Sequence, residues 1–375
     1  MTVHVDQDTV ERHPKSYDGW ALRAALRLCP ELLASSFYFS PLRRQCLFLA
    51  LATFEIGQDV EIRARLLKVA PAFLNSCSTL GDGVARSLAM LRAKAMLEAI
   101  LGQVPPPGLL GTLARLGSQP LPLPGSYERL VGIFKSRSPL DRQRAKVLGQ
   151  ISGPIAVEML RVLHVLDPIF LHPAVVANVN VPTAYAANAA LRWVREHCST
   201  ASDANIRESF VLFARGGLKR WLRAWAERMT RLPFEPPVNF ASGFIPLASG
   251  PAMLDAGRRF RNCLAEKVPE VALGRRYYVE LMKGHSSAGA IVELSRISTG
   301  WLLASVYGPN NDRVPLPLQE EIRIMLRNAG ISVPDHAPGD PDYLAKLAES
   351  FGMWGWNRDR LDGSDLLIEP LDEPA

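Results

Sequence analysis

Apolar residues recur at intervals of three and four along most of the first 235 residues, a period that indicates helices burying one face. Helices are predicted after Pro41, across 84–101 and across 183–197, since proline is tolerated in the first turn of a helix. The proline-rich segment 118–126 marks a possible subdomain break. Residues 1–235 are therefore expected to form a helical region.

The clearest amphipathic helix is predicted at 218–229, with one apolar stripe made of Leu218, Trp221, Leu222, Trp225 and Met229. Arg220 and Arg223 lie on the opposite, basic side of this helix. Three interpretations are open. The stripe can face the core with a solvated basic back, the arginines can contact a phosphate backbone, or the helix can lie on a membrane surface.

The composition of the chain changes across 236–251, a segment rich in proline, glycine and serine that is predicted to be a linker. A compact domain is expected over 252–330. The remaining residues, 331–375, are expected to form a tail with an acidic end. The sequence thus predicts a helical region and a smaller C-terminal domain.

The C-terminal domain carries both helix and strand signals. Helices are predicted at 251–260, at 262–272, where Pro269 can divide the helix in two, and at 318–328. Short apolar runs separated by turn residues predict three strands, Tyr277–Met282, Ala290–Leu294 and Trp301–Tyr307. Because short loops favour antiparallel neighbours, the expected fold class is α+β, a mostly helical N-terminal region plus a three-stranded antiparallel sheet with flanking helices.

Composition narrows the class of protein. The chain has 375 residues, of which 48% are hydrophobic and 21% charged, enough to bury a core. The longest apolar run, 46–54, is about half the roughly 18 residues that span a bilayer, and it predicts a buried helix. The first residues lack the apolar segment of a secretory signal, so a cytoplasmic protein without membrane contact is expected.

Cysteine and histidine spacing predicts neither a disulfide framework nor a metal site. The five cysteines are scattered without a CxxC pair, and the histidines lack metal-binding spacing. Phosphate-loop, dinucleotide-binding and GxSxG motifs are absent from the sequence, which disfavours a nucleotide-dependent enzyme or a serine hydrolase. No cofactor is expected. The net charge of +6 permits contact with nucleic acid or an acidic partner.

The stretch 256–311 carries an ordered series of residues: Gly257, Arg261-Asn262-Cys263, Gly274, the strand AIVELS, and Gly308-Pro309-Asn310-Asn311. With this order and spacing, about residues 245–330 resemble the core of the PcfJ-like family. Glu293 matches the glutamate of the family's second strand, and Asn310 or Asn311 matches the asparagine that follows its third strand.

Two positions depart from the pattern of the family. Lys267 stands where an aromatic residue is common, and Ser305 replaces a common glutamine. The resemblance implies a context of plasmids, phages and other mobile elements. It implies no settled reaction, and an activity that depends on those two positions would be lost here.

Cys263 is the candidate nucleophile of the C-terminal domain, because nearby arginines and a helix start would stabilise its thiolate. A base would be needed, and His285 is the histidine of this domain. The alternative is a small buried packing residue. Glu293 has three interpretations: an ordinary charge on an exposed sheet face, the partner of Arg258 or Arg259 in an ion pair if it faces the arginine-rich helix, or a catalytic carboxylate.

Asn262, Asn310 and Asn311 are candidate ligand contacts, although asparagine at the last two positions is also typical of a turn. The arginines predicted to contact phosphates are Arg220, Arg223, Arg258, Arg259, Arg261, Arg275 and Arg276. Tyr277, Tyr278 and Trp301 could stack on bases or belong to the core.

The leading functional hypothesis is a cytoplasmic accessory protein that binds nucleic acid through a basic C-terminal domain and docks partners through its helical region. Two alternatives stay open. One is an enzyme with Cys263 as its nucleophile. The other is a protein-interaction scaffold whose contacts lie in the helical region.

Overall fold

The computed structural model describes residues 14–28, 30–57, 59–74, 80–238, 243–281 and 289–334. Its internal contacts divide the chain into two compact units. The first, called here the helical unit, comprises 1–195 and 200–222, and the second, the mixed unit, comprises 196–199 and 223–375. The predicted α+β class is confirmed, because helices dominate and one small antiparallel sheet lies in the mixed unit.

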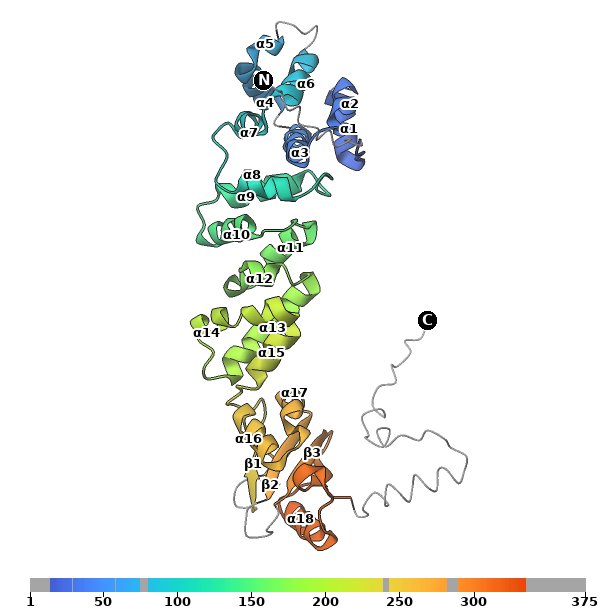
Figure 1. Cartoon of the computed structure of the whole chain (residues 1–375), viewed down its shortest axis with the longest axis vertical. Helices are drawn as coiled ribbons and strands as arrows, with labels where there is room; N and C mark the ends of the chain where they lie inside the picture. Colours follow the sequence, from blue (N-terminus) through green and yellow to red (C-terminus); the bar gives the residue numbers. More distant parts are fainter. Residues whose placement is uncertain are drawn as a thin grey trace, which may run out of the picture. The chain divides into compact units, whose positions relative to one another are not determined.

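The helical unit contains short helices joined by short connections (Figure 1). Their bounds are α1 Gly19–Leu28, α2 Pro30–Ser36, α3 Pro41–Glu55, α4 Asp59–Val69, α5 Pro71–Leu74, α6 Leu80–Met90, α7 Ala93–Leu101, α8 Leu109–Arg115, α9 Gly125–Lys135, α10 Pro139–Gln150, α11 Val157–Val165, η1 Pro168–Phe170, α12 Pro173–Val176, α13 Val181–His197, α14 Asp203–Glu208 and α15 Val211–Ala226. Helices α13 and α15 continue into the mixed unit.

Local signals account for several helix ends. Pro41 and Pro139 occupy the first turns of α3 and α10, where a missing N–H costs no helical hydrogen bond. Helix α7 ends at Gly102 in the left-handed region, which a residue without a Cβ adopts without strain. The Ser202 side chain accepts a hydrogen bond from the Asn205 N–H and caps α14.

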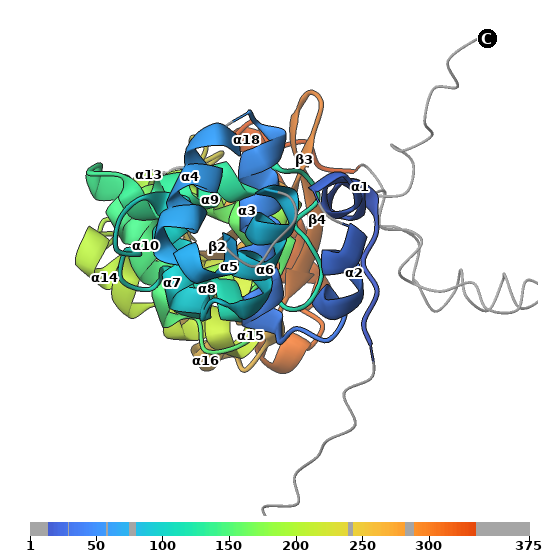
Figure 2. The same cartoon turned by 90° about the horizontal axis from the view of Figure 1, so that it is seen from above.

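Helix α3 lies at the centre of the N-terminal part of the helical unit. Five consecutive residues, 47–51, are buried, as expected for a helix that is apolar on all sides. Figures 1 and 2 show α3 between α1 on one side and α7 on the other. The predicted buried helix over 46–54 is confirmed.

Helix α15 contains the predicted apolar stripe up to Trp225, and this stripe is core; Met229 is buried beyond the end of the helix. Non-helical backbone at Gly216 and Gly217 interrupts the helix just before the stripe begins. Trp221 is fully buried in the helical unit, where its ring packs on Phe170 and Phe213. Trp225 is 1% exposed. The core-facing interpretation of 218–229 is therefore confirmed, with Arg220 and Arg223 on the exposed side.

The mixed unit is built on a four-stranded antiparallel sheet of order β1-β2-β3-β4. Its elements are β1 Phe244–Pro246, α16 Gly250–Phe260, η3 Cys263–Lys267, α17 Val268–Ala272, β2 Arg276–Leu281, β3 Ile291–Ile297, β4 Gly300–Tyr307, η4 Pro309–Asn311 and α18 Leu316–Asn328. The prediction of three strands was wrong by one, because β1 pairs with β2 at the edge of the sheet. Pro269 lies in the first turn of α17 and divides the predicted helix 262–272 into η3 and α17.

The two faces of the sheet differ in chemistry. One face carries Tyr277, Val279 and Leu294 and packs against Ile322 and Leu326 of α18, forming the core of the unit. Figures 1 and 2 show α18 and α16 on opposite sides of the strands. The second face is polar and is covered by α16 and α17, which places charged side chains under those helices.

Within the described ranges, no helix combines the length and the apolar character needed to cross a membrane.

Candidate functional site

The candidate site is the polar face of the sheet. Because side chains alternate along a strand, Arg276, Tyr278 and Glu280 of β2 share the face opposite to the core. Tyr278 lies directly across from Glu293 of β3, and Tyr307 of β4 reaches the same carboxylate. We call this set of five residues the polar face.

The first ion pair of the polar face joins α16 to β2. The Arg259 guanidinium donates two parallel hydrogen bonds to Glu280, of 2.6 and 2.7 Å, and a third of 2.8 Å to Asp255. Hydrogen bonding to Glu280, and then to Asp255, raises the pKa of Arg259 above its ordinary value. Since the Glu280 side chain is buried, this bidentate pair ties α16 to the sheet.

The second ion pair is more deeply buried. Arg276 pairs with Glu293, and its Nε lies 2.8 Å from Glu270 of α17. The Tyr307 hydroxyl donates to Glu293 over 3.1 Å. The expected pairing of Glu293 with Arg258 or Arg259 was wrong, because the strand register puts Arg276 diagonally next to Glu293 on the same face. The Glu293 carboxylate is thus engaged by two donors.

Tyr278 lies between the ion pairs with a hydroxyl that has no hydrogen-bond partner among the described residues. Its side chain is only 2% exposed. Burial raises its pKa above the ordinary value, and the charge of Glu270 acts in the same direction, while the charge of Arg276 opposes it. The hydroxyl therefore stays protonated at neutral pH, and an unsatisfied buried donor of this kind is uncommon.

Cys263 begins the short helix η3 and is exposed. The preceding Asn262 side chain accepts a hydrogen bond from the Leu264 N–H and so caps η3. The interpretation of Cys263 as a buried packing residue was therefore wrong. His285, the predicted base, lies outside the described residues.

Asn310 and Asn311 form the exposed turn η4 between β4 and α18. Both have left-handed backbone, with φ of 56° and 60°, which asparagine tolerates better than most residues. The Gly308 N–H closes the turn on the Asp312 carbonyl over 2.8 Å. The turn packs near α16, so the asparagines, Cys263 and the end of α16 belong to one side of the sheet.

The seven predicted arginines do not form one set. Arg220 belongs to the helical unit, and Arg223 lies 3.5 Å from Glu227, the residue that follows the end of α15. Arg259 and Arg276 are engaged in the ion pairs of the polar face. The three that remain are exposed and, in the described part of the chain, form no ion pair: Arg258, Arg261 and Arg275.

The aromatic residues predicted to stack on bases pack inside the protein instead. Tyr277 and Tyr278 are buried, and the Trp301 ring lies 5.2 Å from that of Phe234.

Sequence reasoning did not single out Glu280, Glu270 or Tyr307. Alternation along β2 is the one signal that could have found Glu280, since a charge among apolar strand residues needs a partner.

The described residues contain no cluster of three His, Cys, Asp or Glu side chains suited to a metal ion. Comparison with known proteins finds no matching family model, no matching curated protein and no matching solved structure. The resemblance to the PcfJ-like family stays a prediction from the residues themselves.

Proposed function

We propose that the mixed unit binds nucleic acid in the cytoplasm through the exposed guanidinium groups of Arg258, Arg261 and Arg275. One observation carries this proposal. The buried acids of the sheet, Glu280 and Glu293, are paired with Arg259 and Arg276, and among the described residues no acid forms an ion pair with the other three arginines. Exposed arginines supply the sequence-independent part of nucleic-acid affinity by displacing counterions from phosphates.

The backbone around these arginines supports the proposal. Arg261 has left-handed backbone at the end of α16, immediately before the cap formed by Asn262. Its neighbour Arg258 lies in the last turn of the same helix. The η4 turn, with the exposed Asn310 and Asn311, packs near α16 and offers amide groups to the same ligand. An accessory role for a mobile element is the context that the resemblance adds.

The proposal predicts that removing these three arginines weakens nucleic-acid binding more than removing three arginines elsewhere in the chain. The triple variant R258A/R261A/R275A is expected to bind a labelled single strand of about 20 nucleotides at least roughly tenfold more weakly at low salt. Removing three phosphate contacts should also reduce the slope of log K against log salt by about 2. Fluorescence anisotropy across roughly 50 to 300 mM salt measures both quantities.

The matched control removes the same charge elsewhere. Arg137, Arg142 and Arg192 are exposed in the helical unit, and their triple alanine variant loses three charges from the same formal total of +6. This control variant should bind the labelled single strand with the affinity of the native chain. Equal losses in the two variants, or a native chain that shows no salt slope, would exclude the proposal.

A second candidate function is favoured by the exposed thiol of Cys263 at the start of η3. Cys263, after losing its proton to solvent, would attack a carbonyl carbon of the substrate, and the C=O π bond would open to an oxyanion as the C–S bond forms. In this function the mixed unit is an enzyme, and the arginines orient an anionic substrate.

The second candidate predicts selective modification of Cys263 in the folded chain. Burial raises the pKa of Cys46 to about 12 and that of Cys198 to about 11, so at pH 8 about one Cys198 thiol in a thousand is ionised. Iodoacetamide should modify Cys263 at least about 100-fold faster than either, as followed by peptide mass spectrometry. A Cys263 that reacts only in denaturant would exclude a nucleophilic role.

A further inference from the structure

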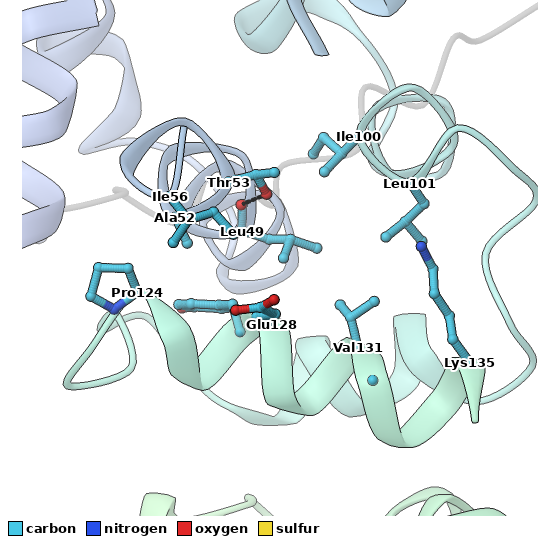
Figure 3. Close-up of a pocket in the computed structure, with 12 residues that line it drawn as sticks. Leu49, Ala52, Thr53, Ile56, Ile100, Leu101, Pro124, Glu128, Val131 and Lys135 are labelled. Carbon is cyan, nitrogen blue, oxygen red and sulfur yellow. Dashed lines mark hydrogen bonds between the residues drawn. The ribbon is translucent and has the colours of Figure 1, made fainter. Parts of the chain in front are cut away.

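A groove in the helical unit lies between α3, α7 and α9, away from every residue assigned a function above (Figure 3). Its volume is about 250 Å³. The lining residues are Leu49, Ala52, Thr53 and Ile56 of α3, Ile100 and Leu101 of α7, and Pro124, Tyr127, Glu128, Val131, Gly132 and Lys135 at α9. The α9 residues recur every three or four positions, so they form one stripe along the whole helix.

The floor of the groove is apolar. The Tyr127 hydroxyl donates to Gln45 over 2.6 Å and accepts from the Leu121 N–H, so its polar end is used internally. The Thr53 hydroxyl donates to the Leu49 carbonyl within α3. Ile56 leaves 41% of its surface exposed at the edge. The groove therefore offers apolar surface and no spare buried polar group for orienting a small molecule.

Two opposite charges border the apolar floor. Glu128 and Lys135 are both exposed on α9, and neither forms an ion pair with another residue that the structure describes. They are seven residues apart, which corresponds to about 10 Å along a helix. Figure 3 shows the Glu128 carboxylate at the groove and the Lys135 chain extending from α9 toward Leu101.

We propose that this groove docks an amphipathic helix of a partner protein. A cavity of about 150 Å³ holds a benzene ring, so this volume fits one aromatic and one smaller apolar side chain. A basic side chain of the partner faces Glu128, and an acidic one, seven residues away on the partner helix, faces Lys135. The partner helix is thus identified by an apolar face bordered by one charge of each sign.

The test uses full-length protein and three labelled helical peptides of about 18 residues that share a Phe and Leu face and differ only in two charges seven residues apart. The native chain should bind the Lys/Glu peptide about tenfold tighter than the Lys/Lys or Glu/Glu peptide. Replacing Glu128 by lysine should transfer the preference to the Glu/Glu peptide. Replacing Lys135 by glutamate should transfer it to the Lys/Lys peptide.

A second pair of variants tests the apolar floor. Gly132 lines the groove and has open space around the position of a Cβ, so Gly132→Leu places an apolar side chain at the groove. Gly149 in α10 has equally open space and lies outside the groove, which makes Gly149→Leu the matched control. Gly132→Leu should weaken all three peptides at least tenfold, and Gly149→Leu should not. Absent binding, equal affinities or an unaffected Gly132→Leu variant would each overturn the proposal.

Discussion

Replacing Gly250 by alanine is expected to destabilise the mixed unit by about 3 kcal/mol, at the upper end of the cost of overpacking. A Cβ at this position would lie 2.4 Å from the Glu227 carbonyl oxygen and 2.6 Å from that of Ala226. These are backbone atoms, so no side chain can move away. The Gly250 N–H also donates to the Met229 carbonyl over 2.9 Å, which holds the start of α16 against this turn.

Urea unfolding of the full chain measures the loss of stability. Hydrogen exchange, read out in peptides from α16 and β2, shows whether the loss is in the mixed unit. Gly125 is the matched control, because it is also the first residue of a helix and has open space around its missing Cβ. Gly125→Ala should be neutral or should stabilise by a few tenths of a kcal/mol. If Gly250→Ala unfolds with the native midpoint, the packing between α16 and residues 226–229 is not tight.

Helices whose boundaries are local were predictable from the sequence. The start at Pro41 and the end at Asn328 are recognisable because Pro41 lies in the first turn of its helix and Gly330 follows the last turn of α18. The predicted strands Tyr277–Met282 and Trp301–Tyr307 agree closely with β2 and β4 for the same reason. Hydrophobic periodicity and the residues typical of element ends identify a helix or strand when its own sequence determines its structure.

The strand β1 was not predicted, because its extended conformation depends on pairing with β2 and not on its own sequence. Phe244–Pro246 is three residues long, and its neighbourhood is rich in proline and glycine. Its extended form is stabilised by pairing with β2, in which Ile245 lies across from Glu280. Pairing between segments separated by more than 30 residues cannot be recognised from a window of a few residues.

The candidate site shows the same limit. Alternation along β3 is enough to put Glu293 on the face away from Val292, but its partner depends on the register between β2 and β3. The same register buries Tyr278 and engages Arg276, which the charge pattern alone assigned to a ligand. Which arginines stay exposed is thus a tertiary property, as is the groove between α3, α7 and α9.

The buried ion pair of the polar face has the second large expected effect. Replacing Arg276 by methionine should cost about 3 to 5 kcal/mol, because it leaves a buried carboxylate without its cation. The Glu293 side chain is 5% exposed, and the Tyr307 hydroxyl is the donor that stays. Arg223→Met is the control, since the Arg223–Glu227 pair is exposed at both ends and should contribute less than about 1 kcal/mol.

A double-mutant cycle separates the ion pair from the cost of leaving one charge alone. The double variant R276M/E293L removes both charges from the buried face, so it should be clearly more stable than the sum of the two single variants implies. The expected coupling energy is about 2 kcal/mol, measured by urea unfolding at fixed pH. Additive single effects would mean that Glu293 is solvated or paired elsewhere. The polar face would then be too loosely held to bury the Tyr278 hydroxyl.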